Sequence, residues 1–342
     1  MENNNDFPEL TGNLEPVNDP NDNGLFLVMN GNRWIDDSRR QPIPRMLFSE
    51  LWYETELCIM FADTNVGKSI LAVLIADSIS RGVPIPGFKL EAAAQPVVYF
   101  DFEQGCKQFE NRYSVNYTDH YRWHDNFYRS AIDPDAQIPD NFDTIEAYIL
   151  YSLERTITNT NAKILIIDNL TYLKNETERA RNALPLMKEL KALKAKYGLS
   201  ILVLAHTPKR DPSKPITRND LQGSKMLINF CDSAFALGES YNDRFLRYIK
   251  QIKQRNTEEI YGADNVILCR ITKPGNFLKF EHEGNGKEWE HLKEKTSEDE
   301  KRQVEMILQL KKEGLSLREI ALKVGVSHVM VLKIMKKAEG KG

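Results

Sequence analysis

Short apolar runs bounded by polar residues recur along the middle of this 342-residue chain. Four of these runs are almost uninterrupted, and they cover residues 57–62, 96–102, 163–168 and 200–205. Apolar runs of this length without alternation are typical of strands that are buried on both faces, as in a parallel sheet. We therefore predict four such strands at the centre of the fold.

Helical patterns lie between the apolar runs, most clearly over residues 68–79 and 184–197. In the second segment one apolar stripe is formed by Leu186, Met187, Leu190 and Leu193. Because strands and helices alternate, we predict an α/β fold with a mostly parallel sheet and helices on both of its faces.

The composition is that of a globular protein, with 41% hydrophobic and 28% charged residues and a formal net charge of −3. This balance excludes wholesale disorder, and it means that any nucleic-acid binding must come from local basic patches. The four cysteines lie far apart without a CxxC pair, which argues against a zinc cluster or a disulfide scaffold. The first residues, MENNNDFPEL, show neither the basic start nor the apolar run of a signal peptide, and the longest apolar runs are too short to span a membrane, so we expect a cytoplasmic protein.

The two ends of the chain differ from its middle. Residues 1–23 hold six acidic residues, seven Asn and three Pro but no Lys or Arg, which predicts a disordered acidic tail over 1–24. We expect the α/β domain to occupy 25–295. A charged hinge at 293–302 then leads into a small helical domain within 296–342.

The strongest motif directly follows the run 57–62 and opens the predicted helix 68–79. It reads ADTNVGKS, a phosphate-binding loop in which Ala stands for the first Gly. Successive backbone N–H groups and the helix N-terminus would wrap the phosphates, Lys68 would reach the β- and γ-phosphates, and Ser69 would bind Mg²⁺. A chance GKS turn is disfavoured by this strand–loop–helix context. We predict an ATP and Mg²⁺ site formed by Ala62, Asp63, Thr64, Asn65, Val66, Gly67, Lys68, Ser69 and Ile70.

Two positions depart from the common form of this loop. Ala62 has less backbone freedom than glycine, and Asp63 places a carboxylate near a site for anions. We expect the Asp63 side chain to point outward, away from the phosphates.

A second element of the site is the apolar run 163–168, which ends in a single carboxylate at Asp168. This is the Walker B form, in which the carboxylate holds the metal through water or together with Ser69. The next residue is Asn169 rather than Glu, so the base that activates water must come from elsewhere.

The natural candidate for that base is Glu103, just past the run 96–102. At the carboxyl end of a strand it could reach a water in line with the γ-phosphate. If the strand stops earlier, Asp101 is the residue at the edge instead. A solvated carboxylate without a catalytic role is the ordinary alternative for either residue.

These motifs, together with the run 200–205 followed by His206, resemble the RecA/DnaB superfamily of P-loop ATPases. They are most similar to the RepA-like hexameric helicases of plasmids and mobile elements, over roughly residues 45–283. The resemblance implies a RecA-like fold, ATP hydrolysis with Mg²⁺, and a homo-oligomer, expected to be a hexameric ring, that acts on DNA.

The same resemblance implies that His206 senses the γ-phosphate and that the segment 207–225 faces single-stranded DNA. A buried or capping histidine is the alternative for His206. The segment contains three Pro and few apolar residues, which predicts a long mobile loop. Against two Asp it carries five basic residues, which are Lys209, Arg210, Lys214, Arg218 and Lys225.

A Lys-x-Arg pair, Lys253 and Arg255, resembles the pair that reaches the nucleotide of the neighbouring subunit in DnaB-like rings. A fixed cation there stabilises charge in the transition state. On an extended strand, residues two apart share a face, so we expect both side chains to point the same way. The alternative is a solvated strand face.

The C-terminal segment reads as two short helices. Ser316 and Glu319 form a capping box for the first helix, and Ser327 caps the second. The apolar positions expected to pack inward are Ile320, Ala321, Val324, Val331, Leu332 and Met335.

This layout resembles the helix-turn-helix of resolvases and repressors, whose second helix enters the major groove of duplex DNA. From Gln309 onward there are eight Lys or Arg against three Glu. The DNA-facing positions would be His328, Met330, Lys333, Lys336 and Lys337. A three-helix cap that binds protein is the alternative.

Two histidines in the segment DHYRWH, His120 and His124, have a spacing that could suit a metal. Their aromatic neighbours instead favour a packed surface helix.

The motifs leave two functions open: an ATP-hydrolysing DNA motor or helicase that works as a ring, and an ATP-gated DNA-binding regulator or loader that does not unwind DNA. A recombinase filament is less favoured.

Overall fold

The computed structural model describes residues 26–169, 183–208, 210–221, 224–294, 297–324, 326 and 328–339. Its contacts divide the chain into two compact units, Met1–Ile43 and Pro44–Gly342. The acidic tail predicted over 1–24 lies outside the described residues, and the predicted domain boundaries stay predictions.

The described part of the first unit contains one short helix, α1 (Gly31–Ser38). The Asn30 side chain caps this helix by accepting a hydrogen bond from the Arg33 N–H at 2.9 Å. None of its residues is buried, and the large side chains of Trp34 and Ile35 are 45% and 57% exposed.

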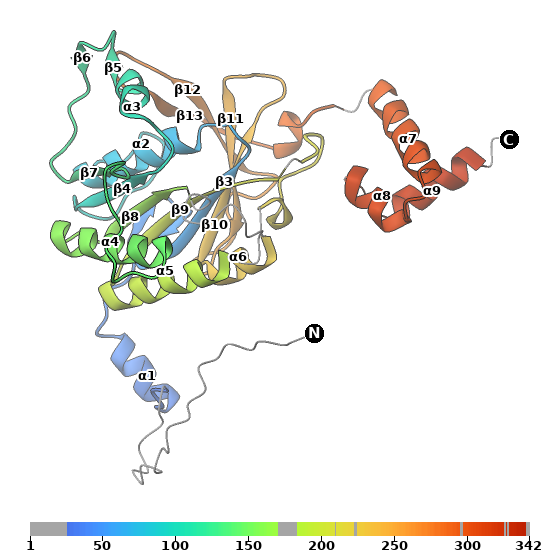
Figure 1. Ribbon diagram of the computed structural model, residues 1–342. Helices are drawn as coiled ribbons and strands as arrows, with labels where there is room; N and C mark the ends of the chain where they lie inside the picture. Colours follow the sequence, from blue (N-terminus) through green and yellow to red (C-terminus); the bar gives the residue numbers. More distant parts are fainter. Residues whose placement is uncertain are drawn as a thin grey trace. The chain divides into compact units, whose positions relative to one another are not determined.

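A nine-stranded sheet forms the centre of the second unit (Figure 1). Six adjacent strands are parallel, in the order β7 (Phe127–Ser130), β4 (Val97–Asp101), β8 (Ile164–Asp168), β9 (Ser200–His206), β3 (Leu57–Ala62) and β10 (Ser233–Glu239). The sheet continues from β10 with three antiparallel strands, β11 (Leu246–Lys253), β12 (Val266–Thr272) and β13 (Lys279–Gly286). The four strands predicted from the apolar runs are β3, β4, β8 and β9, so that prediction is confirmed.

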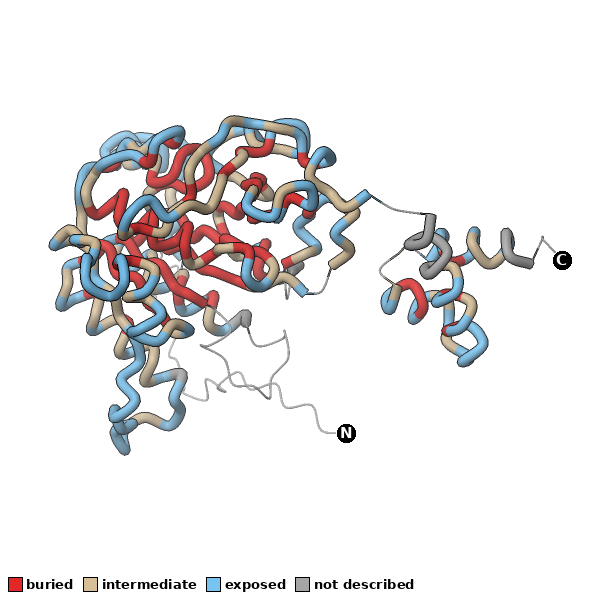
Figure 2. The backbone as a smooth tube through the Cα atoms, turned by 90° about the horizontal axis from the view of Figure 1, so that it is seen from above, coloured by how far each residue is buried: buried red, intermediate tan, exposed pale blue. Residues whose placement is uncertain are grey.

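Helices cover both faces of this sheet, as predicted (Figure 1). One face packs against α2 (Lys68–Arg81), and the other packs against α4 (Ile145–Thr160), α5 (Ala183–Tyr197) and α6 (Ser224–Phe230). Figure 2 shows the buried backbone concentrated in the sheet between them. The fold is therefore the α/β arrangement expected from the sequence, with a mostly parallel sheet and helices on both of its faces.

The side chains of β3 show why a nearly continuous apolar run was needed. Cys58, Met60 and Ala62 belong to the core on the α2 side, while the alternate residues Leu57, Ile59 and Phe61 belong to the core on the other side. All six are at most 1% exposed.

Short elements complete the unit. They are β1 (Met46–Phe48), β2 (Trp52–Tyr53), α3 (Cys106–Arg112), β5 (Ser114–Val115), β6 (Asp119–His120) and the 3₁₀ turns η3 (Arg218–Asp220) and η4 (Glu288–His291). The helix expected for DHYRWH is wrong, because β6 takes its first two residues and no helix follows. Tyr121 and Trp123 instead pack against the core beside α2. Burial of these aromatic side chains is the physical reason that the segment does not form a surface helix.

Three C-terminal helices, α7 (Ser297–Lys312), α8 (Leu317–Val324) and α9 (His328–Glu339), share a small core of their own around Ile307, Ile320 and Val331. The capping box at the start of α8 is present: the Ser316 N–H donates to Glu319 Oε2 at 2.8 Å, and the Glu319 N–H donates to Ser316 Oγ at 3.3 Å.

One inward position predicted for this C-terminal region is wrong. Leu332 is 41% exposed, and Ile334 packs against the small core. The turn residues Gly325 and Ser327 lie outside the described residues.

The strand order places four chain segments at one edge of the sheet. Because β4, β8, β9 and β3 are adjacent and parallel, the residues that follow them meet at their carboxyl ends. In register, Ala62 pairs with His206 and Asp101 pairs with Asp168. This edge is the candidate site.

Candidate nucleotide-binding site

The phosphate-binding loop turns sharply from β3 into α2. Gly67 has φ 112°, and a Cβ at this position would lie 3.0 Å from the side chains of Ile271 and Phe280, so only glycine fits. The loop is also held from β11, where the buried Arg247 donates from Nε to the Val66 carbonyl at 2.9 Å. Thr64 and Asn65 at its tip are exposed, while Val66 and Ile70 are buried.

Lys68 is buried at the start of α2, and burial lowers the pKa of its ammonium. Its Nζ donates to the carbonyls of Ala62 at 3.1 Å and Asp63 at 3.0 Å, and it lies 3.2 Å from Nδ1 of His206. A phosphate oxygen would compete with these neutral acceptors, and an ionised acceptor makes the stronger hydrogen bond.

Asp168 is fully buried at the end of β8, and burial raises the pKa of its carboxyl to about 6. Tyr99 donates its hydroxyl to Asp168 Oδ2 at 2.7 Å. Among the described residues no well-aligned donor reaches Oδ1. The Ser69 hydroxyl lies beside this carboxylate and lowers its pKa.

A buried carboxylate next to a hydroxyl is the donor set that Mg²⁺ takes when substrate phosphates complete its shell. The described residues hold no cluster of three or more His, Cys, Asp or Glu for a metal, and a site of this kind does not require one. Ser69 and Asp168 therefore fit the predicted magnesium site.

Glu103 lies beside the same cluster, just past β4 and partly exposed. Its Oε1 lies 3.5 Å from Nε2 of His206 and accepts a hydrogen bond from the Asn169 amide. The same amide lies 2.9 Å from His206 Nε2. The contact with His206 is the main reason that the pKa of Glu103 is lowered, so this carboxylate stays ionised and available as a base.

Asp101, the alternative base, has a different environment. It is 1% exposed, its Oδ1 accepts the Gln104 N–H at 2.9 Å, and its Oδ2 pairs with Arg129 at 2.9 Å. Both carboxylate oxygens are thus used to hold the turn after β4. Of the two candidates, only Glu103 contacts His206.

The Asp63 side chain turns toward the segment that follows β9. It accepts a hydrogen bond from the Thr207 hydroxyl and lies 3.4 Å from Nε of Arg210. The Thr207 N–H also donates to the Ala62 carbonyl at 3.1 Å. The P-loop and the start of the predicted DNA-facing loop are therefore tied together at two neighbouring residues.

The rest of that loop is attached to the core at Ile216, which is 2% exposed. Its N–H donates to Glu288 Oε1 at 2.6 Å, and its carbonyl accepts from Lys250 Nζ at 2.7 Å. Lys250 and Glu288 form a buried ion pair at 2.5 Å. The segment predicted as one long loop is thus anchored in its middle, and it also contains η3 and the start of α6.

The predicted DNA-facing residues of this loop are only partly described. Arg210 is almost buried, Lys214 lies 3.7 Å from Asp211, and Arg218 begins η3. Lys209 lies outside the described residues, as does the side chain of Lys225.

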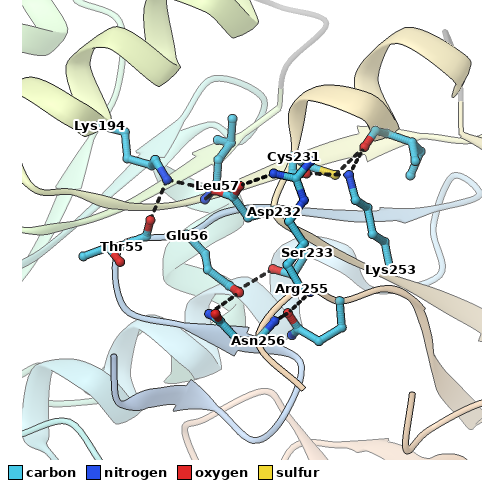
Figure 3. A network of polar contacts seen from close by, with 12 residues as sticks. Thr55, Glu56, Leu57, Lys194, Cys231, Asp232, Ser233, Lys253, Arg255 and Asn256 are labelled. Atoms are coloured by element: carbon cyan, nitrogen blue, oxygen red, sulfur yellow. Dashed lines mark hydrogen bonds and ion pairs between the residues drawn. The ribbon is translucent and has the colours of Figure 1, made fainter. Parts of the chain in front are cut away.

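Lys253 and Arg255 lie near the amino ends of the parallel strands, away from the phosphate-binding loop, because Lys253 pairs with Ala234 at the start of β10 and Ser233 pairs with Cys58 near the start of β3. Lys253 ends β11 and donates to the carbonyls of Ile228 and Cys231, while Arg255 lies 3.2 Å from Asp232 just before β10 (Figure 3). The expectation that both share a strand face is wrong, because β11 ends at Lys253. Within one chain, neither residue contacts the phosphate-binding loop.

In the C-terminal helices, the predicted DNA-facing side chains His328, Met330, Lys333 and Lys336 are exposed on α9. The side chain of Lys337 lies outside the described residues.

Sequence reasoning missed several residues of the site. Tyr99 reads as one more apolar position in a buried strand, Asn169 lacks the carboxylate expected of a base, and Arg247 lies in a strand that the apolar runs do not mark. A polar residue within an apolar run was the available signal for Tyr99.

One protein family matches the part of the chain that holds this site. A profile described as an AAA domain matches residues 29–212, which is more than half of the chain. The chain belongs to the AAA domain family. This AAA domain match includes Lys68, Glu103, Asp168 and His206, and it ends before Lys253 and the C-terminal helices. The chain is a P-loop ATPase.

Among solved structures, the chain is similar to a KaiC-like protein from the hyperthermophilic archaeon Pyrococcus horikoshii, at 13% identity and a TM-score of 0.46. The similarity covers 67% of this chain and 91% of that one. No curated protein matches the sequence.

In the part of the AAA protein that the structure describes, no helix combines the length and the apolar character needed to cross a bilayer.

Proposed function

We propose that this protein is an ATP-hydrolysing DNA motor of the RepA-like type, acting in the cytoplasm as an oligomeric replicative helicase of a plasmid or mobile element. The observation that carries the proposal is the contact chain from Lys68 through His206 to Glu103, which continues directly into the loop at Thr207. The residue that contacts the proposed nucleotide site, His206, is therefore the direct neighbour of Thr207, where the loop begins.

In the proposed reaction each residue has a defined task. Glu103 orients the attacking water and takes its proton, and Lys68 stabilises charge on the β- and γ-phosphates. His206 lies between these two side chains, so a change at the γ-phosphate alters the contacts of the residue that directly precedes the DNA-facing loop. Ser69 and Asp168 would hold Mg²⁺, which neutralises charge on the phosphates.

The proposal places each nucleotide between two subunits of a ring, expected to be a hexamer. Its support is that Lys253 and Arg255 lie near the amino ends of the parallel strands, away from their own P-loop, so they could complete only the site of another copy. A head-to-tail contact of this kind closes into a ring when the rotation permits. Arg255 would exchange Asp232 for the neighbour's phosphates.

A mixing experiment tests the shared site. Lys68→Ala and Arg255→Ala variants should each lose turnover, and Arg255→Ala should still bind ATP. In a mixture, the Arg255→Ala subunits carry an intact phosphate-binding loop and the Lys68→Ala subunits carry an intact Arg255. If subunits assort at random, these two intact parts meet at about a quarter of the interfaces. Recovery of activity toward that level is expected. A mixture as inactive as its parts, or full activity of Arg255→Ala, would overturn the shared site.

A second function, an ATP-gated DNA-binding regulator or loader, is favoured by the C-terminal helices. Their separate core, the capping box on α8 and the exposed lysines of α9 suit duplex recognition, which a processive helicase has little need for.

Strand displacement measured beside duplex binding separates the two functions. Displacement that depends on ATP and survives Lys333→Ala/Lys336→Ala supports the motor. Duplex binding without displacement, lost in the same double variant, supports the regulator.

A further inference from the structure

A pocket of about 240 Å³ opens beside the phosphate-binding loop but not on its phosphate side. It shares Asp63 and Val66 with that loop, and Lys68, Ser69 and Asp168 do not line it. The rest of its wall comes from the end of β10, from the 240–245 turn between β10 and β11, from the loop after β9 and from η4. The mechanism above does not use this space.

We propose that this pocket binds a base of single-stranded nucleic acid, stacked on Tyr241. The inference rests on the proposed DNA-binding function and adds a contact site to it. Tyr241 lines the pocket and its side chain is 59% exposed. Exposed aromatic rings next to cations are the usual platform on which single strands stack.

The turn that carries Tyr241 is held in place by the core. The Tyr241 N–H donates to the His291 carbonyl at 2.9 Å, and the Asn242 amide donates to the Glu290 carbonyl at 2.9 Å. The exposure of the ring therefore does not come from a loose chain, and because the backbone that carries the ring is already held, it loses little freedom when a base stacks on the ring.

Two basic side chains lie close to the aromatic rings of this region. Lys293 Nζ lies 6.0 Å from the Tyr241 ring centroid, and the Arg244 guanidinium, which also lines the pocket, lies 4.5 Å from the centroid of the half-exposed Phe245 ring. Of these four side chains, Tyr241 and Arg244 line the pocket, so it offers both a ring for base stacking and a cation for the backbone.

The charges inside the pocket favour a neutral base over a phosphate. The lining holds two carboxylates, Asp63 and Glu239, and two guanidinium groups, Arg210 and Arg244, so its charges balance, and Arg210 is paired with Asp63 at 3.4 Å. The volume is smaller than the about 300–1,000 Å³ of sites for drug-sized ligands, which suits one base rather than a whole nucleotide. Arg210 also belongs to the loop after His206, so the pocket adjoins the proposed path of the strand.

Binding of a fluorescent oligo(dT) to the full chain, followed by anisotropy with a non-hydrolysable ATP analogue, tests the inference. Tyr241→Ala should weaken binding about 5- to 150-fold, the range that loss of one stacked base produces. Tyr241→Trp should retain binding, and Tyr128→Ala, which removes an exposed ring on β7, serves as the matched control.

Two further readouts identify the base as the contact. The slope of log K against log salt should stay the same in Tyr241→Ala, because no phosphate contact is lost. An oligonucleotide of abasic sites should bind wild type and Tyr241→Ala equally.

Equal oligo(dT) affinity of the variant and wild type would overturn the inference. Weaker ATP-analogue binding with unchanged DNA binding would also overturn it and assign the pocket to the base of the bound nucleotide. If wild type binds no single strand at all, the proposed DNA-binding function fails with it, which distinguishes the two failures.

Discussion

The carboxylate of Asp63 in the phosphate-binding loop lies 3.4 Å from the guanidinium of Arg210 in the loop that follows β9. The Thr207 hydroxyl donates to the same carboxylate. An acidic residue in a loop that binds anions is unfavourable on its own, and here a cation from the predicted DNA-facing loop compensates for it. Asp63 is thus placed to link the nucleotide to that loop.

We predict that Asp63→Asn tightens nucleotide binding and weakens its coupling to DNA. Loss of the negative charge favours phosphate, while Arg210 gains freedom to meet a DNA phosphate, which should steepen the salt dependence of single-strand binding by somewhat less than one unit. Asp211→Asn, in the same loop, is the matched control. ATPase assays with and without single-stranded DNA check this, and a variant with unchanged stimulation and salt slope would refute the link.

The environments of Glu103 and Asp101 predict opposite phenotypes for two similar substitutions. Glu103→Gln should lower turnover by about 100- to 10,000-fold with nucleotide binding intact, because it removes a general base from an exposed position. Asp101→Asn should mainly destabilise the fold, by about 3–5 kcal/mol, because it leaves Arg129 without its buried partner. Turnover and urea unfolding of both variants separate the roles, and the reverse pattern would make Asp101 the base.

The buried Asp168 predicts a stability effect that depends on pH. Its folded-state pKa of about 6 lies above the ordinary value of 3.8 because of burial. Its contribution to stability is therefore fully present below about pH 4 and is lost as the pH rises through about 6. Without metal, Asp168→Asn should be more stable than wild type by up to about 3 kcal/mol at pH 8 and by little at pH 4.

Chemical unfolding of both proteins in a chelator at the two pH values measures this difference. Turnover of Asp168→Asn should be lost at every pH, because the proposed metal ligand is changed. If the stability difference between Asp168→Asn and wild type does not vary with pH, burial does not raise the pKa of the Asp168 carboxyl in the folded protein.

The centre of the fold could be predicted from the sequence because its strands are buried on both faces. A residue such as Ile59 must be apolar wherever its side chain points, so the run itself marks the strand. The meeting of Lys68, Asp168 and Glu103 followed from the rule that parallel strands end at one edge. His206 came from a family resemblance.

The antiparallel half of the sheet could not be predicted in the same way. Strand β11 includes Arg247 and Lys250, both buried, so its sequence reads as polar. Each cation is satisfied by a group far away along the chain: the Val66 carbonyl for Arg247 and Glu288 for Lys250. The pattern of one segment cannot indicate partners that lie so far away along the chain. For the same reason, the sequence does not predict that Ile216 anchors the 207–225 loop.

That anchor gives the last prediction. Glu288→Ala leaves Lys250 as an unpaired buried cation and removes the acceptor of the Ile216 N–H, so unfolding should become easier by about 3–5 kcal/mol. Adding Lys250→Met to Glu288→Gln removes the charge while an acceptor remains for Ile216, and it should recover part of the loss. Lys279→Ala, which breaks a more exposed pair with Glu281, should cost less than about 1 kcal/mol. Urea unfolding gives these values, and limited proteolysis should show faster cleavage within 207–221 in Glu288→Ala than in Lys279→Ala. Equal stability and equal cleavage in the two variants would mean that the buried pair does not hold the loop.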